Sequence, residues 1–139
     1  MSIKQRQDEV IEEFAMYDDW MDKYEYLISL GKELPLIDED KKIEDNLIVG
    51  CQSQVWLDAE MNDGNVVYKA DSDAIITKGI ISLMIQVLSN STPKEIIESE
   101  LYFIDKIGLK EHLSPTRSNG LVSMVKQMQI YALAFKHKN

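Results

Sequence analysis

The chain has 139 residues, of which 45% are hydrophobic and 28% charged, a composition typical of an ordered globular protein. This length lets one domain, residues 1–139, bury a core without disulfide or metal staples. The 24 acidic and 15 basic residues give a net charge of -9, which repels phosphate backbones and anionic lipid headgroups and so disfavours nucleic acid and membranes as partners.

The first ten residues carry charged side chains between Lys4 and Glu9 and have no apolar run. They therefore resemble neither a signal peptide nor a membrane span. The chain also has a single cysteine, Cys51, so it cannot form an intrachain disulfide. Both observations favour the cytoplasm as its compartment.

Two amphipathic helices are predicted at the start of the chain. Apolar residues at helical spacing indicate the first over residues 3–16. The second is expected over residues 20–30, where it stops because Gly31 comes next. Residues 32–45 contain a proline and a run of charges, which predicts an exposed connector.

A three-stranded antiparallel sheet is predicted for the middle of the chain. Strand signals cover residues 47–49, 55–61 and 66–70, and the second of these alternates between apolar and polar side chains. The last two strands are separated by a turn that contains Asp63-Gly64. Asp-Gly adopts the positive φ angles of tight hairpins, so these two strands should form a hairpin.

Helices are predicted for the rest of the chain. Residues 74–88 form an apolar run that predicts a buried helix capped by Ser72 or Asp73. A capping box with proline at the first helical position starts a short helix at Thr92. Two further short helices are expected over residues 101–107 and 109–113, followed by a loop over 114–120 and a last helix with an apolar stripe over 121–135. A helix pair, a three-stranded antiparallel sheet and then several helices indicate a two-layer α+β fold.

Cys51 is the first candidate for chemistry. A lone cysteine cannot supply a multi-thiolate metal site, so any reaction of this thiol must be completed by another molecule. Gly50 before it and Gln52, Ser53 and Gln54 after it predict a loop between two strands. The competing interpretation is a small buried hydrophobe, and composition alone favours neither.

Arg117 is the one cation that we place near this thiol. A guanidinium beside a thiol lowers the thiol pKa and raises the fraction of thiolate, which is the form that attacks sulfur. Without further information, a solvated arginine or one paired with a carboxylate is favoured in this acidic chain.

Other constellations give weaker signals. His112, His137 and one cysteine are a poor supply for a metal site, and no spacing supports a catalytic pair of Cys51 with His112. Asp71 and Asp73 could serve acid–base work, although capping of the following helix is favoured. The six glycines form no phosphate-binding loop.

Four motifs occur together in this chain. The first is Gly50-Cys51-Gln52-Ser53-Gln54-Val55-Trp56. The others are Trp20 and Lys23-Tyr24 with Leu30-Gly31 and Leu34-Pro35, Asp71-Ser72-Asp73-Ala74 with Lys78-Gly79, and His112-Leu113-Ser114-Pro115-Thr116-Arg117-Ser118-Asn119-Gly120-Leu121. In their order along the chain, over residues 14–135, these motifs resemble the SufE family of sulfur acceptor proteins, which work with cysteine desulfurases in iron–sulfur cluster assembly.

The resemblance implies that Cys51 accepts a sulfane sulfur, as a persulfide, from a SufS-type cysteine desulfurase. The chain would stimulate that enzyme and pass the sulfur to an iron–sulfur scaffold. Arg117 would stabilise the thiolate or persulfide. The surface that meets the desulfurase would include Gly50, Gln52, Ser53, Gln54, Asp71 and Asp73.

The resemblance also implies an accessory protein that is not itself an enzyme, with pyridoxal phosphate on the partner desulfurase and no cofactor or metal of its own. The expected fold is shared with IscU and NifU-type scaffolds, and the expected state is a monomer or weak homodimer. Two alternatives stay open: a regulatory protein that binds a desulfurase without carrying sulfur, and a one-cysteine thiol enzyme that uses Cys51 with His112.

Overall fold

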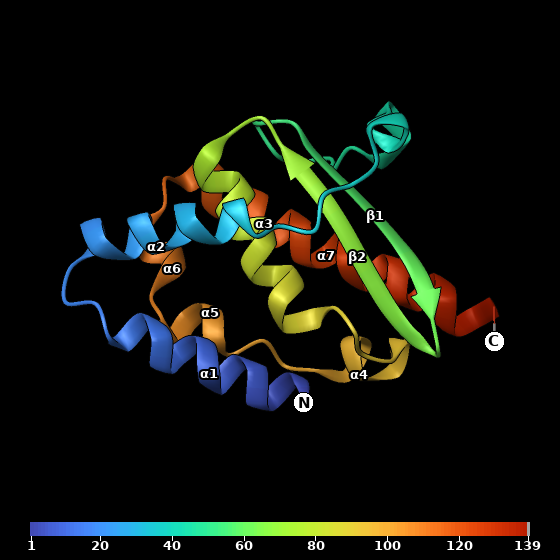
Figure 1. Cartoon of the computed structure of the whole chain (residues 1–139), viewed down its shortest axis with the longest axis horizontal. Helices are drawn as coiled ribbons and strands as arrows, with labels where there is room; N and C mark the ends of the chain where they lie inside the picture. Colours follow the sequence, from blue (N-terminus) through green and yellow to red (C-terminus); the bar gives the residue numbers. More distant parts are fainter. Residues whose placement is uncertain (139) are drawn as a thin grey trace.

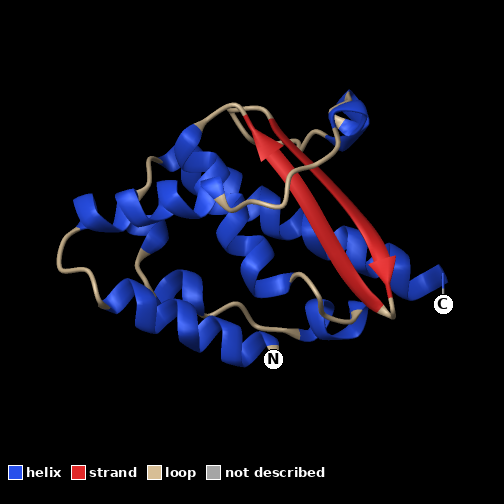
Figure 2. Ribbon diagram, viewed as in Figure 1, coloured by secondary structure: helices blue, strands red, loops and turns tan. Residues whose placement is uncertain are grey.

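The structure, a computed structural model, describes residues 1–138 and has an α+β fold. Within these residues one two-stranded antiparallel sheet packs with one face against the α-helices (Figures 1 and 2). No helix among them is both long and apolar enough to cross a membrane. The elements are α1 (Ile3–Ala15), α2 (Trp20–Lys32), β1 (Val55–Asn62), β2 (Asn65–Ser72), α3 (Ile75–Leu88), α4 (Pro93–Glu98), α5 (Phe103–Lys106), α6 (Leu109–His112) and α7 (Pro115–Lys138), with two 3-10 turns at Glu39–Lys41 and Glu44–Asn46.

The predicted hairpin is confirmed. Strands β1 and β2 pair in antiparallel register from Val55 opposite Ser72 to Asn62 opposite Asn65. The two turn residues, Asp63 and Gly64, both have positive φ angles, 52° and 82°. This is the turn geometry whose twist matches that of the strands, and it explains why Asp-Gly stands at this position.

The prediction of a third strand at residues 47–49 is wrong. Leu47 forms only a single antiparallel bridge to Trp56 at the outer edge of β1. A 3-10 turn ends at Asn46 on one side, and the chain turns at Val49 and Gly50 on the other. A ladder needs several extended residues in a row, and these two turns leave too few of them.

The hairpin is fixed to the helices by its inward face. Val55 and Leu57 of β1 and Val66, Tyr68 and Ala70 of β2 alternate along the strands and are fully buried. In Figure 1 the hairpin runs across α3 and α7. The Tyr68 hydroxyl donates a hydrogen bond of 2.6 Å to the main-chain oxygen of Met128 in α7, so the sheet is tied to the last helix.

The end predicted for the second helix is corrected by the packing of α2 on α3. Helix α2 continues through Gly31 to Lys32. Gly31 serves a close helix crossing, because a side chain on it would come within 3.1 Å of the main-chain nitrogen of Gly79. A glycine where two helices touch has the same sequence signature as a glycine that ends a helix.

The loop predicted over residues 114–120 is also corrected. Helix α7 begins at Pro115, so these residues form its first turns. The Ser114 hydroxyl accepts a hydrogen bond of 3.3 Å from the main-chain nitrogen of Arg117, as an N-terminal cap does. Serine followed by proline at the first helical position is a helix start, and here the sequence contained that signal.

Gly79→Ala tests the close crossing of α2 and α3. A methyl group at Gly79 would overlap the carbonyl oxygen of Leu27 and lie 2.7 Å from its carbonyl carbon. Alanine favours an isolated helix by about 1 kcal/mol over glycine, but here the clash is with main chain and should cost more. We expect a net loss of about 2 kcal/mol in the free energy of unfolding, measured by urea denaturation.

Gln86→Ala is the matched control, because Gln86 is an exposed position on the same helix. This variant should change the free energy of unfolding by less than about 0.5 kcal/mol. A Gly79→Ala protein as stable as the parent would show that the two helices have room for a methyl group.

Candidate functional site

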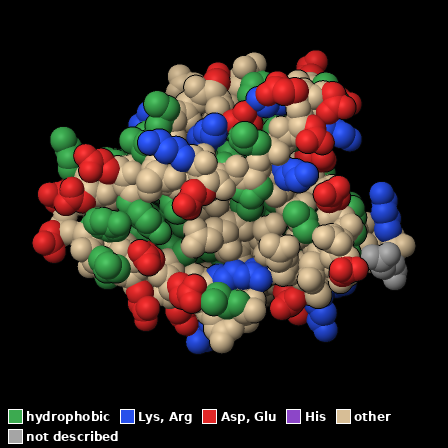
Figure 3. Space-filling model, in the orientation of Figure 1, with side chains coloured by type: hydrophobic (Ala, Val, Ile, Leu, Met, Phe, Trp, Pro, Cys, Tyr) green, Lys and Arg blue, Asp and Glu red, His purple; other side chains and the backbone are tan. Residues whose placement is uncertain are grey.

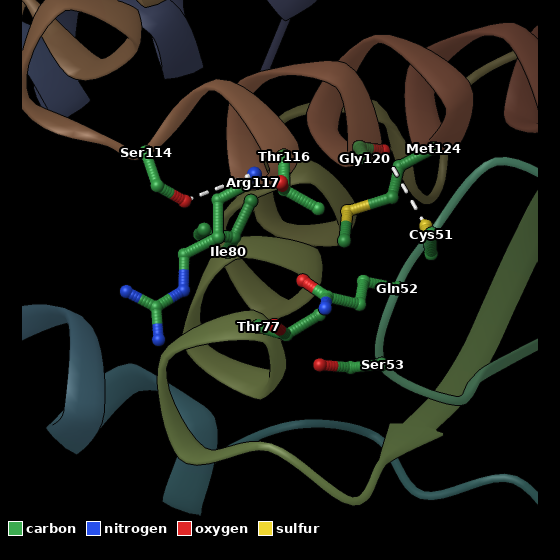
Figure 4. Close-up of a pocket in the computed structure, with 10 residues that line it drawn as sticks. All are labelled: Cys51, Gln52, Ser53, Thr77, Ile80, Ser114, Thr116, Arg117, Gly120 and Met124. Atoms are coloured by element: carbon green, nitrogen blue, oxygen red, sulfur yellow. Dashed lines mark hydrogen bonds between the residues drawn. The ribbon is translucent and has the colours of Figure 1, made fainter.

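A cavity of about 350 Å³ lies where the loop before β1 meets the first turns of α3 and α7 (Figure 4). It brings together the central motif of the sequence, which contains Cys51, and the segment from Ser114 onward that begins α7, more than sixty positions later. Its lining residues are Cys51, Gln52, Ser53, Thr77, Ile80, Ser114, Thr116, Arg117, Gly120 and Met124.

The Cys51 thiol lies at one side of this cavity against α7. Cys51 is half-buried, and its Sγ atom donates to the main-chain oxygen of Gly120 at 3.6 Å. A side chain on Gly120 would lie 3.5 Å from that sulfur, at ordinary van der Waals distance, so the thiol packs directly against the first turns of α7. Burial raises the pKa of Cys51, because the thiolate loses solvation. In this conformation the thiol is therefore protonated at neutral pH.

The loop that carries Cys51 has its shape because of Gly50. The φ angle of Gly50 is 98°, a conformation that other residues rarely adopt. A side chain on Gly50 would also overlap the hydroxyl oxygen of Ser123 in α7. The adjacent Val49 is 91% exposed. The loop thus presents an apolar side chain to solvent and turns the thiol inward.

Asp73 secures the other end of this loop. Its carboxylate accepts a hydrogen bond of 3.1 Å from the main-chain nitrogen of Gln54, and its own main-chain nitrogen donates 3.3 Å to the Gln54 oxygen. The prediction that Ser72 or Asp73 caps α3 is wrong, because Ala74 holds the cap position and no side chain bonds there. The Ser72 hydroxyl instead accepts from the Ala74 nitrogen at 3.2 Å.

Asp71 connects three segments next to the site. Its carboxylate lies 2.6 Å from the Lys42 ammonium of the connector and 3.3 Å from that of Lys78 in α3. Burial opposes its ionisation, but hydrogen bonds from Lys42, Ser72 and Lys78 outweigh burial and lower the pKa of Asp71. Asp71 is therefore an ionised carboxylate that joins Lys42 to Lys78 through ion pairs, and it is not an acid–base group. A role for Asp71 or Asp73 in partner binding remains a prediction.

Arg117 lines the cavity from the first turn of α7. In Figure 4 its guanidinium extends away from the Cys51 sulfur, toward the opposite side of the cavity. It is exposed, and within residues 1–138 it forms no ion pair with a carboxylate. The stabilisation of a thiolate by Arg117 remains a prediction, and it requires this long side chain to turn toward the thiol.

His112 does not line the cavity. Its ring stacks on Trp20, with ring centroids 3.9 Å apart, and its Nδ1 atom is 3.0 Å from the Gly108 oxygen. This arrangement gives His112 a packing role where α6 meets α2. No group of three or more His, Cys, Asp or Glu side chains within residues 1–138 could hold a metal ion.

Several residues of the site escaped the sequence reasoning. Thr77, Ile80 and Met124 lie in runs that look like ordinary buried helix, and they line the cavity. Ser123 lies beneath the turn at Gly50, and the main-chain oxygen of Gly120 lies against the thiol. Among the predictions from sequence, only the expected proximity of Arg117 to the Cys51 thiol indicated this part of the molecule.

A family model described as SufE: Fe-S metabolism associated domain matches residues 8–132. The chain belongs to the SufE family. The match includes the loop with Cys51, the strands that follow it and the start of α7. Membership in this family implies a role in iron–sulfur metabolism. It confirms the family that the four motifs indicated.

Sequence relatives have the same family name. An uncharacterized SufE-like protein of Synechocystis sp. is 42% identical over 127 residues, which cover 91% of this chain and 80% of that protein. An uncharacterized SufE-like protein of Rhizobium etli is 40% identical over 127 residues, covering 88% of this chain and 86% of that protein.

One solved structure shows the same fold. It is the solution structure of a hypothetical protein from Thermus thermophilus, with a TM-score of 0.77 and 19% sequence identity. The alignment covers 93% of this chain and 94% of that one. At this identity the likeness is evidence for the fold alone.

The burial of Cys51 predicts slow alkylation. Because burial raises the pKa of the thiol, less thiolate is present at neutral pH than in an unfolded chain. We expect the rate of alkylation by iodoacetamide to rise with a midpoint at higher pH in the folded protein than in urea. An equal or lower midpoint in the folded protein would show that the thiol is solvated or lies near a cation.

Proposed function

We propose that this protein is a sulfur carrier, which takes a sulfane sulfur onto Cys51 from a SufS-type cysteine desulfurase and delivers it for iron–sulfur cluster assembly. The observation that carries the proposal is a single thiol, on a turned loop, at the side of a cavity in a protein of the SufE family. With no second cysteine in the chain, a sulfur bound to Cys51 cannot be discharged as an intrachain disulfide.

The chemical step is a thiol exchange. The Cys51 thiolate attacks the outer sulfur of a persulfide on the desulfurase and forms a new sulfur–sulfur bond. The sulfur–sulfur bond in the desulfurase breaks, and its cysteine leaves as a thiolate, which takes the proton that Cys51 released. No net oxidation occurs, so the carrier needs no redox cofactor, and pyridoxal phosphate belongs to the desulfurase in this proposal.

The geometry of the loop supports a partner-dependent step. A half-buried thiol with a raised pKa is a poor nucleophile, and the Gly120 main chain lies against it. The desulfurase would therefore have to draw out the loop that carries Gly50, Gln52, Ser53 and Gln54. Exposed Val49 on this loop offers an apolar contact for that purpose.

The cavity suits the product of the step. A persulfide is more acidic and more reactive than a thiol, and a bound sulfur that points inward meets few competing thiols or oxidants. Gly120 itself places no side chain against the sulfur. We propose that the loaded loop returns to this cavity, where Arg117 lies at the rim and can balance the negative charge.

Incubation with a SufS-type desulfurase and cysteine should add sulfur to Cys51. Mass spectrometry of the intact protein and of the peptide with Cys51 should find an added sulfur atom that a reductant removes. Cys51→Ser should carry none and should lose the stimulation of desulfurase turnover, because an alcohol cannot accept sulfur from a persulfide.

Two results would contradict sulfur carriage. A Cys51→Ser protein that still stimulates the desulfurase would favour the regulatory alternative. Peroxide consumption, or acylation of Cys51, in the absence of any desulfurase would favour a thiol enzyme. His112→Ala distinguishes sulfur carriage from a thiol enzyme that uses Cys51 with His112. A carrier should gain as much persulfide on Cys51 in this variant as in the parent.

Arg117→Gln should slow the transfer of sulfur to Cys51. If the guanidinium lowers the thiol pKa by about one unit in the complex, its loss should reduce the rate by about three- to tenfold. Arg117→Lys retains the positive charge and should retain most of the rate. Single-turnover transfer from a loaded desulfurase is the measurement.

Lys138→Gln is the matched control, because it removes one positive charge at the far end of the same helix. It should leave the transfer rate unchanged. Equal rates and persulfide yields in the parent and in Arg117→Gln would remove Arg117 from the mechanism without affecting the role of Cys51.

A further inference from the structure

Helix α7 differs in charge from the rest of the chain. Its 24 residues include none of the 24 acidic residues and four of the 15 basic ones, Arg117, Lys126, Lys136 and Lys138. Elsewhere acidic side chains are widespread, and in Figure 3 they gather over the connector at the upper right and around the turn between α1 and α2 at the left. The longest helix is therefore a basic element in an acidic protein.

The outer face of α7 is apolar as well. Val122, Ile130 and Leu133 are 49%, 47% and 45% exposed, and their spacings of eight and three residues place them on one side of the helix. The opposite side packs into the core through Met124 and Met128. A helix with one buried face normally has a polar outer face, so these exposed side chains are unusual.

These side chains form one wall of a groove, which we call the α7 groove. Two adjoining hollows of about 200 and 220 Å³ share Lys126 and Gln129. The facing wall consists of Ile97 of α4, Ile104 of α5 and Lys110 of α6. From residue 121 to residue 133 the groove follows about 18 Å of helix, which is enough for about three turns of a bound helix.

The α7 groove is separate from the Cys51 cavity. The two share no lining residue. Met124 faces the cavity and Lys126 faces the groove, and two residues correspond to about 200° around a helix. A molecule in the groove would therefore leave the thiol accessible.

We propose that the α7 groove binds a segment of a partner protein that presents apolar side chains flanked by aspartate or glutamate. The apolar walls supply contact area, and the charged side chains that line the groove, Lys110 and Lys126, are both positive. Among the described lining residues there is no carboxylate to satisfy these lysines. An acidic segment complements this groove, although the net charge of the chain would repel it elsewhere.

The same charges disfavour two other occupants. A second copy packed through the same face would bring lysines against lysines, and each copy has a net charge of -9. An anionic membrane would be attracted by only two lining lysines and repelled by the rest of the chain.

Selection of peptides on the intact protein tests this inference. A display library of random 14-residue peptides would be selected for binding to the parent chain. The affinity of the enriched peptides would then be measured by fluorescence anisotropy. We expect peptides with Leu, Ile or Phe at helical spacing and an excess of Asp and Glu. Ile130→Asp should weaken their binding at least tenfold, and Lys126→Glu about three- to tenfold.

Lys41→Glu is the matched control, because it makes the same charge reversal at an exposed site on the connector. It should leave peptide affinity unchanged, and so should Cys51→Ser, so the result does not depend on sulfur carriage. Thermal unfolding checks that each variant is folded.

Several outcomes would overturn the inference. These are enriched peptides that are basic, binding that Ile130→Asp and Lys126→Glu do not weaken, or no enrichment at all. Self-association that Ile130→Asp abolishes would assign the groove to a second copy. Binding to phosphatidylserine vesicles that Ile130→Asp abolishes would assign it to a membrane.

Discussion

The candidate site depends on how the hairpin is held against α7. Two tyrosine hydroxyls make this connection: Tyr68 of β2 donates to the Met128 oxygen at 2.6 Å, and Tyr131 of α7 donates to the Leu57 oxygen at 3.0 Å. Burial raises the pKa of both phenols, so both remain donors over the physiological range. Because the bonds are buried or half-buried and satisfy main-chain oxygens, losing either would leave a polar group without a partner. With β1 placed on the helix, the loop before it must meet the first turns of α7, and the thiol lies there.

This placement sets two requirements against each other. In the proposed transfer the thiol has to be sheltered when it carries sulfur and ionised when it attacks, and burial serves the first at the expense of the second. The two ends of the loop differ in how firmly they are held. Its base is fixed by the reciprocal bonds between Gln54 and Asp73, while its tip has an exposed Val49 and a glycine in a left-handed conformation. A thiol is a weak hydrogen-bond donor, so losing its interaction with the Gly120 oxygen, at 3.6 Å, costs little when the thiol leaves the cavity.

Local signals account for what the sequence could predict. The Asp63-Gly64 turn, the capping box at Thr92 and the apolar run of α3 each depend on neighbouring residues, and each was found at the expected place. The loop predicted over residues 114–120 overlooked a local signal, Ser114-Pro115, whereas other errors came from residues whose role is set by distant segments. Gly31 allows the contact with α3, and Asp73 holds the loop of Cys51 through Gln54. The orientation of Arg117 also depends on the shape of the cavity, which no spacing in the sequence encodes.

Helix α7 combines these tasks because its sides face different environments. One side meets the hairpin and the thiol, a second side packs into the core against α4, and a third side is apolar, basic and exposed. In the proposed transfer a single thiol meets a donor and an acceptor in turn at the same atom, so both partners cannot occupy the Cys51 cavity together. A second contact on a separate side of the helix would keep one partner close while the thiol is exchanged. Such tethering raises the effective concentration of that partner, and the transfer then needs no tight complex at the thiol itself. Weak binding at the thiol would favour the proposed transfer, because the partner has to release the loop after each step.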